Sequence, residues 1–277
     1  MTINPAPLIK LANGVAMPQL GLGTWPLDAA AAAQAVASAL EIGYRLVDTA
    51  ENYGNEAGVG EGIRRSGIAR EDVFVTSKFN RQWHGVDGVG EACEASLKRL
   101  GLDYLDLLLV HWPNPDQDRY VEAFEGLVRV MEAGKVRAIG TSNFKPAHLQ
   151  RLFDAGFVPH VNQIQLDPWH TRDDIVAIHA ERGIVTETWS PIGRGGELLV
   201  EDAIVSVAQR YGRTPAQIVL RWQTQRGFVA VPKSADPQRQ AQNLDIFDFR
   251  LTDEEMAAIN ALKRTDAEIL DADIFGH

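Results

Sequence analysis

The feature that most constrains the fold of this chain is a regular alternation of short apolar segments with helix-like segments. Each pair spans roughly thirty residues, the length of a β-α unit. Eight apolar segments follow this pattern, at 19–24, 46–47, 73–76, 105–110, 138–140, 161–164, 184–188 and 228–231. Strands that alternate with helices are typical of a parallel sheet covered by helices. The 277 residues are therefore predicted to form one α/β domain, a (β/α)8 TIM barrel that spans residues 1–277.

Local signals mark where several elements begin and end. Asp28 precedes the alanine-rich segment Ala29–Ile42, and Gly43 follows it, so these two residues are predicted to cap a helix. The Asn13-Gly14 pair predicts an N-terminal β-hairpin within residues 8–17. Two predicted helices, 201–211 and 254–262, are additional to the eight-unit barrel. The acidic, irregular tail 265–277 is expected to lie over one end of the barrel.

A doubly wound open sheet is the alternative fold. It requires a glycine-rich phosphate loop between an early strand and its helix. The segment Gly21-Leu22-Gly23-Thr24 lacks the third glycine, and no helix begins directly after it. The barrel is therefore the preferred prediction.

Composition excludes several classes of partner. The chain has 37 acidic and 27 basic residues and a formal net charge of −10, which argues against nucleic acid or an anionic membrane as the main partner. No apolar run approaches the roughly 18 residues of a membrane span. The single cysteine, Cys93, rules out an internal disulfide and a cysteine-based metal site. Because residues 1–11 do not resemble a signal peptide, we expect a cytoplasmic protein.

Polar and aromatic side chains follow the predicted strands, at the positions where each strand ends. In barrels of this class, the active site is built at the carboxyl ends of the strands. The residues at these ends are Trp25, Asp48, Lys78, His111, Ser142, Asn143, Gln163, Trp189 and Lys233. Any one of them has a structural explanation, such as a helix cap or a surface lysine. Their occurrence at successive strand ends predicts a catalytic site.

One subset of these residues suits proton donation to a carbonyl oxygen while a hydride reaches the carbonyl carbon. Tyr53 supplies a phenol, whose ordinary pKa is near 10, and a nearby Lys78 ammonium would stabilise its phenolate. Asp48 would hold the lysine charged and in place. A neutral His111 would donate a hydrogen bond that orients the substrate oxygen. The sequence thus predicts a phenolic acid tuned for neutral pH.

Four ordered motifs resemble those of the aldo-keto reductase family. They are Asp48 to Glu56, Leu107 to Pro113, Gly140 to Phe144, and Val231 to Ser234. The chain is most similar to the bacterial 2,5-diketogluconate reductase group. The resemblance implies an NADPH-dependent oxidoreductase that reduces aldehydes and ketones to alcohols. It also implies a catalytic tetrad of Asp48, Tyr53, Lys78 and His111, with Tyr53 as the general acid.

The resemblance also implies roles for residues outside the tetrad. Ser142, Asn143 and Gln163 match positions that bind the nicotinamide carboxamide, and Trp189 matches an aromatic on which the nicotinamide ring stacks. The remaining cofactor-binding positions are Ser190, Lys233, Ser234, Arg239, Gln242 and Asn243, and the substrate-pocket walls are Trp25 and Trp112. Asp236 within the phosphate-binding segment is expected to weaken a preference for the 2′-phosphate. We expect a monomer that acts on a small-molecule carbonyl substrate and uses no metal.

Two other function classes stay open at this point. A cofactor-binding regulator is built on the same barrel in channel-associated subunits, and a turnover assay would separate it from an enzyme. A metal-dependent barrel lyase or hydrolase would need paired acids and histidines at ligand spacing, which the chain does not offer.

Overall fold

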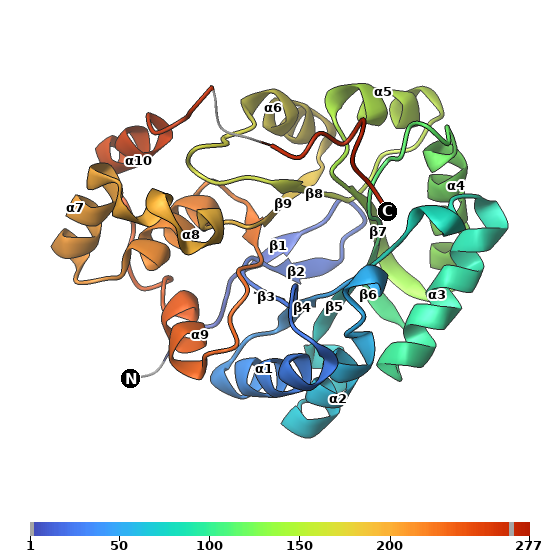
Figure 1. Ribbon diagram of the computed structural model, residues 1–277, viewed down its shortest axis with the longest axis horizontal. Coiled ribbons are helices and arrows are strands. Elements are labelled where there is room, and N and C mark those ends of the chain that lie inside the picture. Colours follow the sequence, from blue (N-terminus) through green and yellow to red (C-terminus); the bar gives the residue numbers. More distant parts are fainter. Residues whose placement is uncertain (1–2, 266–268) are drawn as a thin grey trace.

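The computed structural model describes residues 3–265 and 269–277 (Figure 1). Eight parallel strands form its central sheet, in the order in which they occur along the chain. They are β3 (Leu22–Gly23), β4 (Leu46–Asp48), β5 (Phe74–Phe79), β6 (Leu105–Val110), β7 (Val136–Ser142), β8 (Val161–Gln165), β9 (Val185–Trp189) and β10 (Val229–Ala230). Residues 266–268 of the predicted tail lie outside the described residues.

The sheet closes on itself. Leu20 pairs with Ala230, and Gly23 pairs with Lys233, so the first strand segment joins the last. A Cβ atom at Gly23 would lie 2.6 Å from the carbonyl oxygen of Val231, which explains the glycine at this seam. The closure confirms the predicted (β/α)8 barrel and rules out the open doubly wound sheet.

Helices surround the barrel, as the sequence predicts (Figure 1). Those that follow barrel strands are α1 (Ala29–Ile42), α2 (Glu56–Ser66), α3 (Val86–Leu100), α4 (Tyr120–Glu132), α5 (Pro146–Asp154), α6 (Asp173–Arg182), α8 (Pro215–Gln225) and α9 (Pro237–Leu244). The two additional helices are α7 (Asp202–Tyr211) and α10 (Asp253–Asn260). Short 3-10 segments lie at Glu51–Tyr53, Arg70–Asp72, Arg81–Trp83, Gly193–Gly195 and Glu197–Val200.

The predicted caps form. The side chain of Asp28 accepts a hydrogen bond of 2.8 Å from the backbone N–H of Ala31, and Gly43 ends α1 with a φ of 125°. Two threonines act in the same way elsewhere: Thr214 caps α8, and Thr252 caps α10. Each cap satisfies N–H groups that the first turn of a helix leaves without partners.

The lower layer of the barrel interior is apolar. Side chains from successive strands pack there in one cluster, which includes Leu46, Phe74, Val161, Val185 and Val229. The predicted hairpin, β1 (Leu8–Lys10) paired with β2 (Ala16–Pro18), contributes Leu11 and Met17 to the same cluster. The hairpin therefore closes the amino-terminal end of the barrel.

The next layer of the interior is polar. Residues two apart on a strand point to the same face, so Asp48 lies above Leu46, Gln163 above Val161, and Glu187 above Val185. All three polar residues are buried. The barrel thus changes from apolar to polar one layer below the carboxyl ends of its strands.

The carboxyl-terminal tail crosses the open end of the barrel (Figure 1). The backbone N–H of Arg81 donates a 2.9 Å hydrogen bond to the carbonyl of His277, and Phe275 packs edge-on against Trp112 at 4.8 Å between ring centroids. Lys145 at the start of α5 forms ion pairs with Asp271 and Asp273. Within residues 3–265 and 269–277, no helix has the length and apolarity needed to cross a membrane.

Candidate active site

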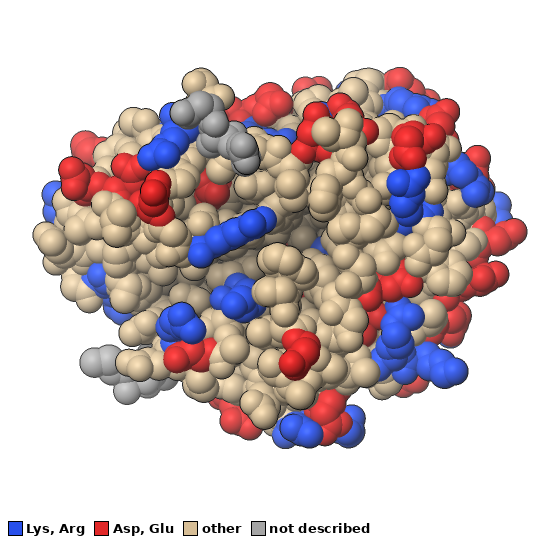
Figure 2. Space-filling view, in the orientation of Figure 1, with Lys and Arg blue, Asp and Glu red and all other residues tan. Residues whose placement is uncertain are grey.

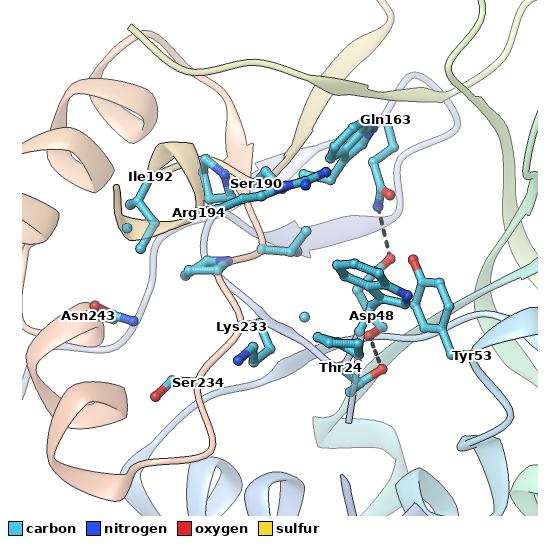
Figure 3. A pocket seen from close by; sticks show the side chains of 18 of the residues that line it. Thr24, Asp48, Tyr53, Gln163, Ser190, Ile192, Arg194, Lys233, Ser234 and Asn243 are labelled. Atoms are coloured by element: carbon cyan, nitrogen blue, oxygen red, sulfur yellow. Dashed lines mark hydrogen bonds between the residues drawn. The ribbon is translucent and has the colours of Figure 1, made fainter. Parts of the chain in front are cut away.

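A cavity of about 740 Å³ opens at the carboxyl ends of the strands. Every predicted site residue except Lys78 lines it. In Figure 3, Tyr53 lies at one end of this cavity, and Ser234 and Asn243 lie at the other. The structure therefore brings the predicted catalytic and cofactor-binding residues into one elongated site.

Lys78 is fully buried beneath the cavity. Its ammonium lies 2.8 Å from each carboxylate oxygen of Asp48, 2.9 Å from the carbonyl of Thr49 and 3.3 Å from the hydroxyl of Tyr53. A buried ammonium needs this degree of compensation, because removal from water strongly disfavours the charge. Burial alone would lower the pKa of Lys78, but the Asp48 carboxylate outweighs it, so the pKa is raised and the lysine stays charged.

Tyr53 follows β4 in a 3-10 turn, and its hydroxyl contacts the lysine. Burial raises the pKa of Tyr53, and the Lys78 ammonium offsets this only in part. The prediction of a phenol tuned for neutral pH is therefore not met in the protein alone, because desolvation of the phenolate is the larger effect. Tyr53 is a protonated acid at neutral pH.

His111 follows β6 and faces Tyr53 edge-on, with 5.8 Å between ring centroids. Burial and the Lys78 charge lower the pKa of His111 well below its ordinary value, so the imidazole is neutral, as predicted. Its Nδ1 has no hydrogen-bond partner among the described residues. The ring of His277 lies 5.1 Å from that of His111, also edge-on. The tail thus reaches the end of the cavity that holds Tyr53 and His111.

Asn143 links three parts of the site. Its backbone has a φ of 63°, a left-handed conformation that asparagine tolerates. Its amide nitrogen donates to the carbonyl of His111 and to the hydroxyl of Ser142, and its amide oxygen accepts from the indole N–H of Trp189 at 2.8 Å. These bonds fix the Trp189 indole beside the cavity and use both amide hydrogens of Asn143.

Gln163 connects the tetrad to a second buried acid. Its amide nitrogen donates 2.9 Å hydrogen bonds to Asp48 and to Glu187 (Figure 3 shows the first). Glu187 is fully buried in the middle of β9. Burial, reinforced by the Asp48 charge, raises the pKa of Glu187 to about 8. Glu187 therefore favours its neutral form at pH 7.

The other end of the cavity is basic. Lys233, Arg239 and Arg194 line it, and none forms an ion pair within the described residues. Figure 2 shows basic side chains beside the central hollow and most acidic side chains toward the outer edge. Asp236 caps α9, because its carboxylate accepts a 2.9 Å hydrogen bond from the N–H of Arg239. An anionic ligand is thus favoured here, despite the acidic net charge of the chain.

Sequence reasoning missed several residues of this site. Arg194 lies in a glycine-rich segment that no periodicity marks, and its backbone φ is 58°. Phe275 and His277 come from the irregular tail, whose path depends on tertiary contacts. Glu187 could have been found from the sequence, because it lies two residues before Trp189 and so on the same face of the strand. An acid at that position in an otherwise buried strand is conspicuous.

The chain is similar to one family of known proteins along most of its length. A model described as the Aldo/keto reductase family matches residues 14–264. An aldo-keto reductase of Mycolicibacterium smegmatis is 43% identical over 259 residues, which cover 93% of this chain and 94% of that protein. The methylglyoxal reductase DkgA of Yersinia pestis is 45% identical over 273 residues, 98% of each chain. A crystal structure of a Gox0644 variant in complex with NADPH has a TM-score of 0.94 and 39% identity, and the match covers 99% of this chain and 100% of that one.

Proposed function

Because the chain belongs to the aldo-keto reductase family, we propose that it reduces small aldehydes or ketones to alcohols, with Tyr53 as the proton donor and NADPH as the hydride donor. The protein is an NAD(P)H-dependent oxidoreductase. The assignment of Tyr53 as proton donor rests on its contact with a buried ion pair. The Tyr53 hydroxyl lies 3.3 Å from the Lys78 ammonium, which is paired with Asp48.

The cavity suits a nicotinamide dinucleotide in three respects. Lys233, Arg239 and Arg194 offer positive charge for phosphate groups at one end. The Trp189 indole, held by Asn143, offers a flat apolar face for an aromatic ring. Gln163 directs both amide hydrogens away from the cavity to carboxyl groups, which leaves its oxygen to accept from a carboxamide. Ser142, Ser190, Ser234, Gln242 and Asn243 complete the set of cavity-lining residues that we assign to the cofactor.

The chain's own residues would manage the proton. NADPH, when bound, supplies a hydride to the carbonyl carbon. Tyr53 would donate its proton to the carbonyl oxygen, and Lys78 would stabilise the resulting phenolate. His111, which is neutral, would donate a hydrogen bond to the same oxygen and so orient the substrate. Asp48 would hold Lys78 charged and in place.

The substrate end of the cavity is partly apolar. Trp112 is buried, whereas Trp25 is 52% exposed, and both line the cavity together with Phe275 from the tail. Aromatic walls with few polar groups suit a compact carbonyl compound that has an apolar part.

A turnover assay tests the proposed function. Loss of NADPH absorbance would be followed with a panel of small aldehydes, diketones and sugar ketones. We expect measurable reduction of several of them without any protein partner. Tight NADPH binding with no turnover across the panel would instead favour the cofactor-binding regulator.

Removal of metal ions should leave activity unchanged. In the described part of the chain, no cluster of three or more His, Cys, Asp or Glu side chains is arranged to hold a metal. The proposed acid is a phenol, and the proposed oxyanion partner is an imidazole, so the chemistry needs no Lewis acid. Dialysis against a strong chelator, followed by the turnover assay, checks this. Activity that is lost and then restored by zinc would contradict the proposal.

The unmodified protein should bind NADPH more tightly than NADH by at least about tenfold. Charge-assisted hydrogen bonds from Lys233 and Arg239 to the 2′-phosphate would contribute roughly 1.5 to 3 kcal/mol each. Arg239→Ala should therefore raise the NADPH dissociation constant with little effect on NADH. Titration of tryptophan fluorescence measures both constants, since Trp189 lies beside the proposed ring site.

Asp236 should reduce this preference, and Asp236→Ser should widen it. At a partly solvated site the repulsion is about 1 kcal/mol, or roughly fivefold in affinity. Serine is the matched substitution, because it removes the charge but can still cap α9 by accepting from the N–H of Arg239. Equal affinities for the two cofactors in the unmodified protein would count against the phosphate site.

A further inference from the structure

Glu187 is a buried acid at the floor of the site that the proposed mechanism does not use. It lies on β9 opposite Gln163 of β8, and its Oε2 accepts a 2.9 Å hydrogen bond from the Gln163 amide nitrogen. Its other oxygen, Oε1, has no hydrogen-bond partner among the described residues. A buried carboxyl group with one unpaired oxygen is costly, so its presence calls for a reason.

The hydrogen bonds from the Gln163 amide nitrogen to Glu187 and to Asp48 together determine which way that amide points. The amide nitrogen has two hydrogens, and the second goes to Oδ2 of Asp48 at 2.9 Å. Asp48 already binds Lys78, so it cannot take both hydrogens of Gln163 without changing that pair. With Glu187 present, the nitrogen is fully used on the protein side. The Gln163 oxygen is then the only polar atom of the amide left for a ligand in the cavity.

The charge state of Glu187 fits this role. The ionisable groups that face Glu187 are Asp48 on β4, Tyr53 after β4 and Lys78 on β5. On the two neighbouring strands, the residues paired with Glu187 are Gln163 of β8 and Val229 of β10. The Lys78 ammonium is balanced by Asp48. A second carboxylate would leave the floor with a net negative charge beneath the phenol that must become a phenolate. A neutral Glu187 accepts the hydrogen bond without adding that charge.

We propose that Glu187 is a positioning residue, a neutral carboxylic acid that locks the Gln163 amide with its oxygen toward the cavity and thereby makes the site select a cofactor ring that carries a carboxamide N–H. This role rests on the proposed function, because it assumes that the ring binds beside Gln163. On this proposal, a residue of β9 contributes to cofactor selection by orienting the Gln163 amide.

The test compares NADP with its acetylpyridine analogue, in which a methyl group replaces the carboxamide nitrogen. Dissociation constants are measured by tryptophan fluorescence, so turnover is not the readout. We expect the unmodified protein to favour NADP by roughly three- to tenfold, the usual range for one hydrogen bond. Glu187→Leu should reduce this ratio to below about twofold, because the Gln163 amide then keeps only its bond to Asp48 and can turn about that single contact. Glu187→Gln should keep the ratio, because its amide oxygen can still accept from Gln163.

The outcomes separate this inference from the proposed function. If the unmodified protein binds neither NADP nor the analogue, the proposed function fails. If it binds and discriminates, and Glu187→Leu discriminates equally well, the role of Glu187 is wrong. Should Glu187→Leu not fold, Glu187→Met supplies the same loss of acceptor with a more adaptable side chain.

A second measurement tests the neutral state. The pKa of Glu187 is near 4.5 when unfolded and about 8 in the fold, so the folded protein holds a proton that the unfolded chain releases. The resulting stability is present below pH 4.5 and is lost as the pH rises toward 8. The denaturation midpoint of Glu187→Gln should therefore exceed that of the unmodified protein by a margin that grows from pH 5 to pH 8. A margin that is constant over this range would mean that Glu187 is charged, and would overturn the proposal.

Discussion

Replacement of Tyr53 by phenylalanine should abolish carbonyl reduction while NADPH binding stays nearly unchanged. The substitution removes only the hydroxyl that lies 3.3 Å from Lys78, and it keeps the ring that packs edge-on against His111. General acid catalysis is worth roughly a hundredfold to ten-thousandfold, so kcat should fall by at least two orders of magnitude. Stopped or continuous NADPH absorbance assays give kcat, and fluorescence titration gives the dissociation constant.

This prediction is specific because kcat should fall while the NADPH dissociation constant stays nearly unchanged. A fall in both turnover and NADPH affinity would indicate a damaged fold. Turnover within about tenfold of the unmodified protein would mean that another group donates the proton, with His111 or His277 as the nearest candidates. In that case the assignment of Tyr53 is wrong.

Lys78→Met should remove activity and also destabilise the protein. Methionine fills a similar volume, but it leaves the Asp48 carboxylate buried with Gln163 as its remaining side-chain donor. Removal of one partner from a buried ion pair typically costs about 3 to 5 kcal/mol. Activity should fall by at least about a hundredfold, because Lys78 lowers the pKa of Tyr53 against the effect of burial. Chemical denaturation and the turnover assay measure the two effects.

A double variant separates these two effects. Asp48→Asn combined with Lys78→Met removes both charges and should recover much of the lost stability, because no unpaired ion is left in the interior. Turnover should not recover, since the phenol still lacks its ammonium. If the double variant regains activity, Lys78 serves only to support the fold.

The sequence predicted the fold well, because each barrel unit carries its own local signals. Caps such as Asp28 and Thr214 define helix starts through short-range hydrogen bonds, so no tertiary knowledge is needed to place them. The strand ends were equally readable. A polar residue such as Asp48 or His111 directly after an apolar strand segment, a pattern repeated along the chain, indicates the functional rim.

Other parts of the site depend on contacts between distant segments, which one sequence does not reveal. The position of Phe275 over Trp112 follows from ion pairs between α5 and the tail, more than 120 residues apart in the chain. The Gln163 amide nitrogen bonds to Asp48, 115 residues earlier in the chain, and to Glu187, 24 residues later. The net rise in the pKa of Tyr53 reflects burial, which depends on the assembled barrel.

The order of the site residues along the chain has a consequence for how such proteins diversify. The four residues assigned to proton transfer lie between Asp48 and His111, on the units of β4, β5 and β6, whereas those assigned to the cofactor begin at Ser142 and end at Asn243. On these assignments, the first half of the chain would encode the acid, and the second half would encode the coenzyme preference. Recombination near the middle of the gene would then exchange one property and preserve the other, provided that the hydrogen bond between Gln163 and Asp48, which joins the two halves, is kept.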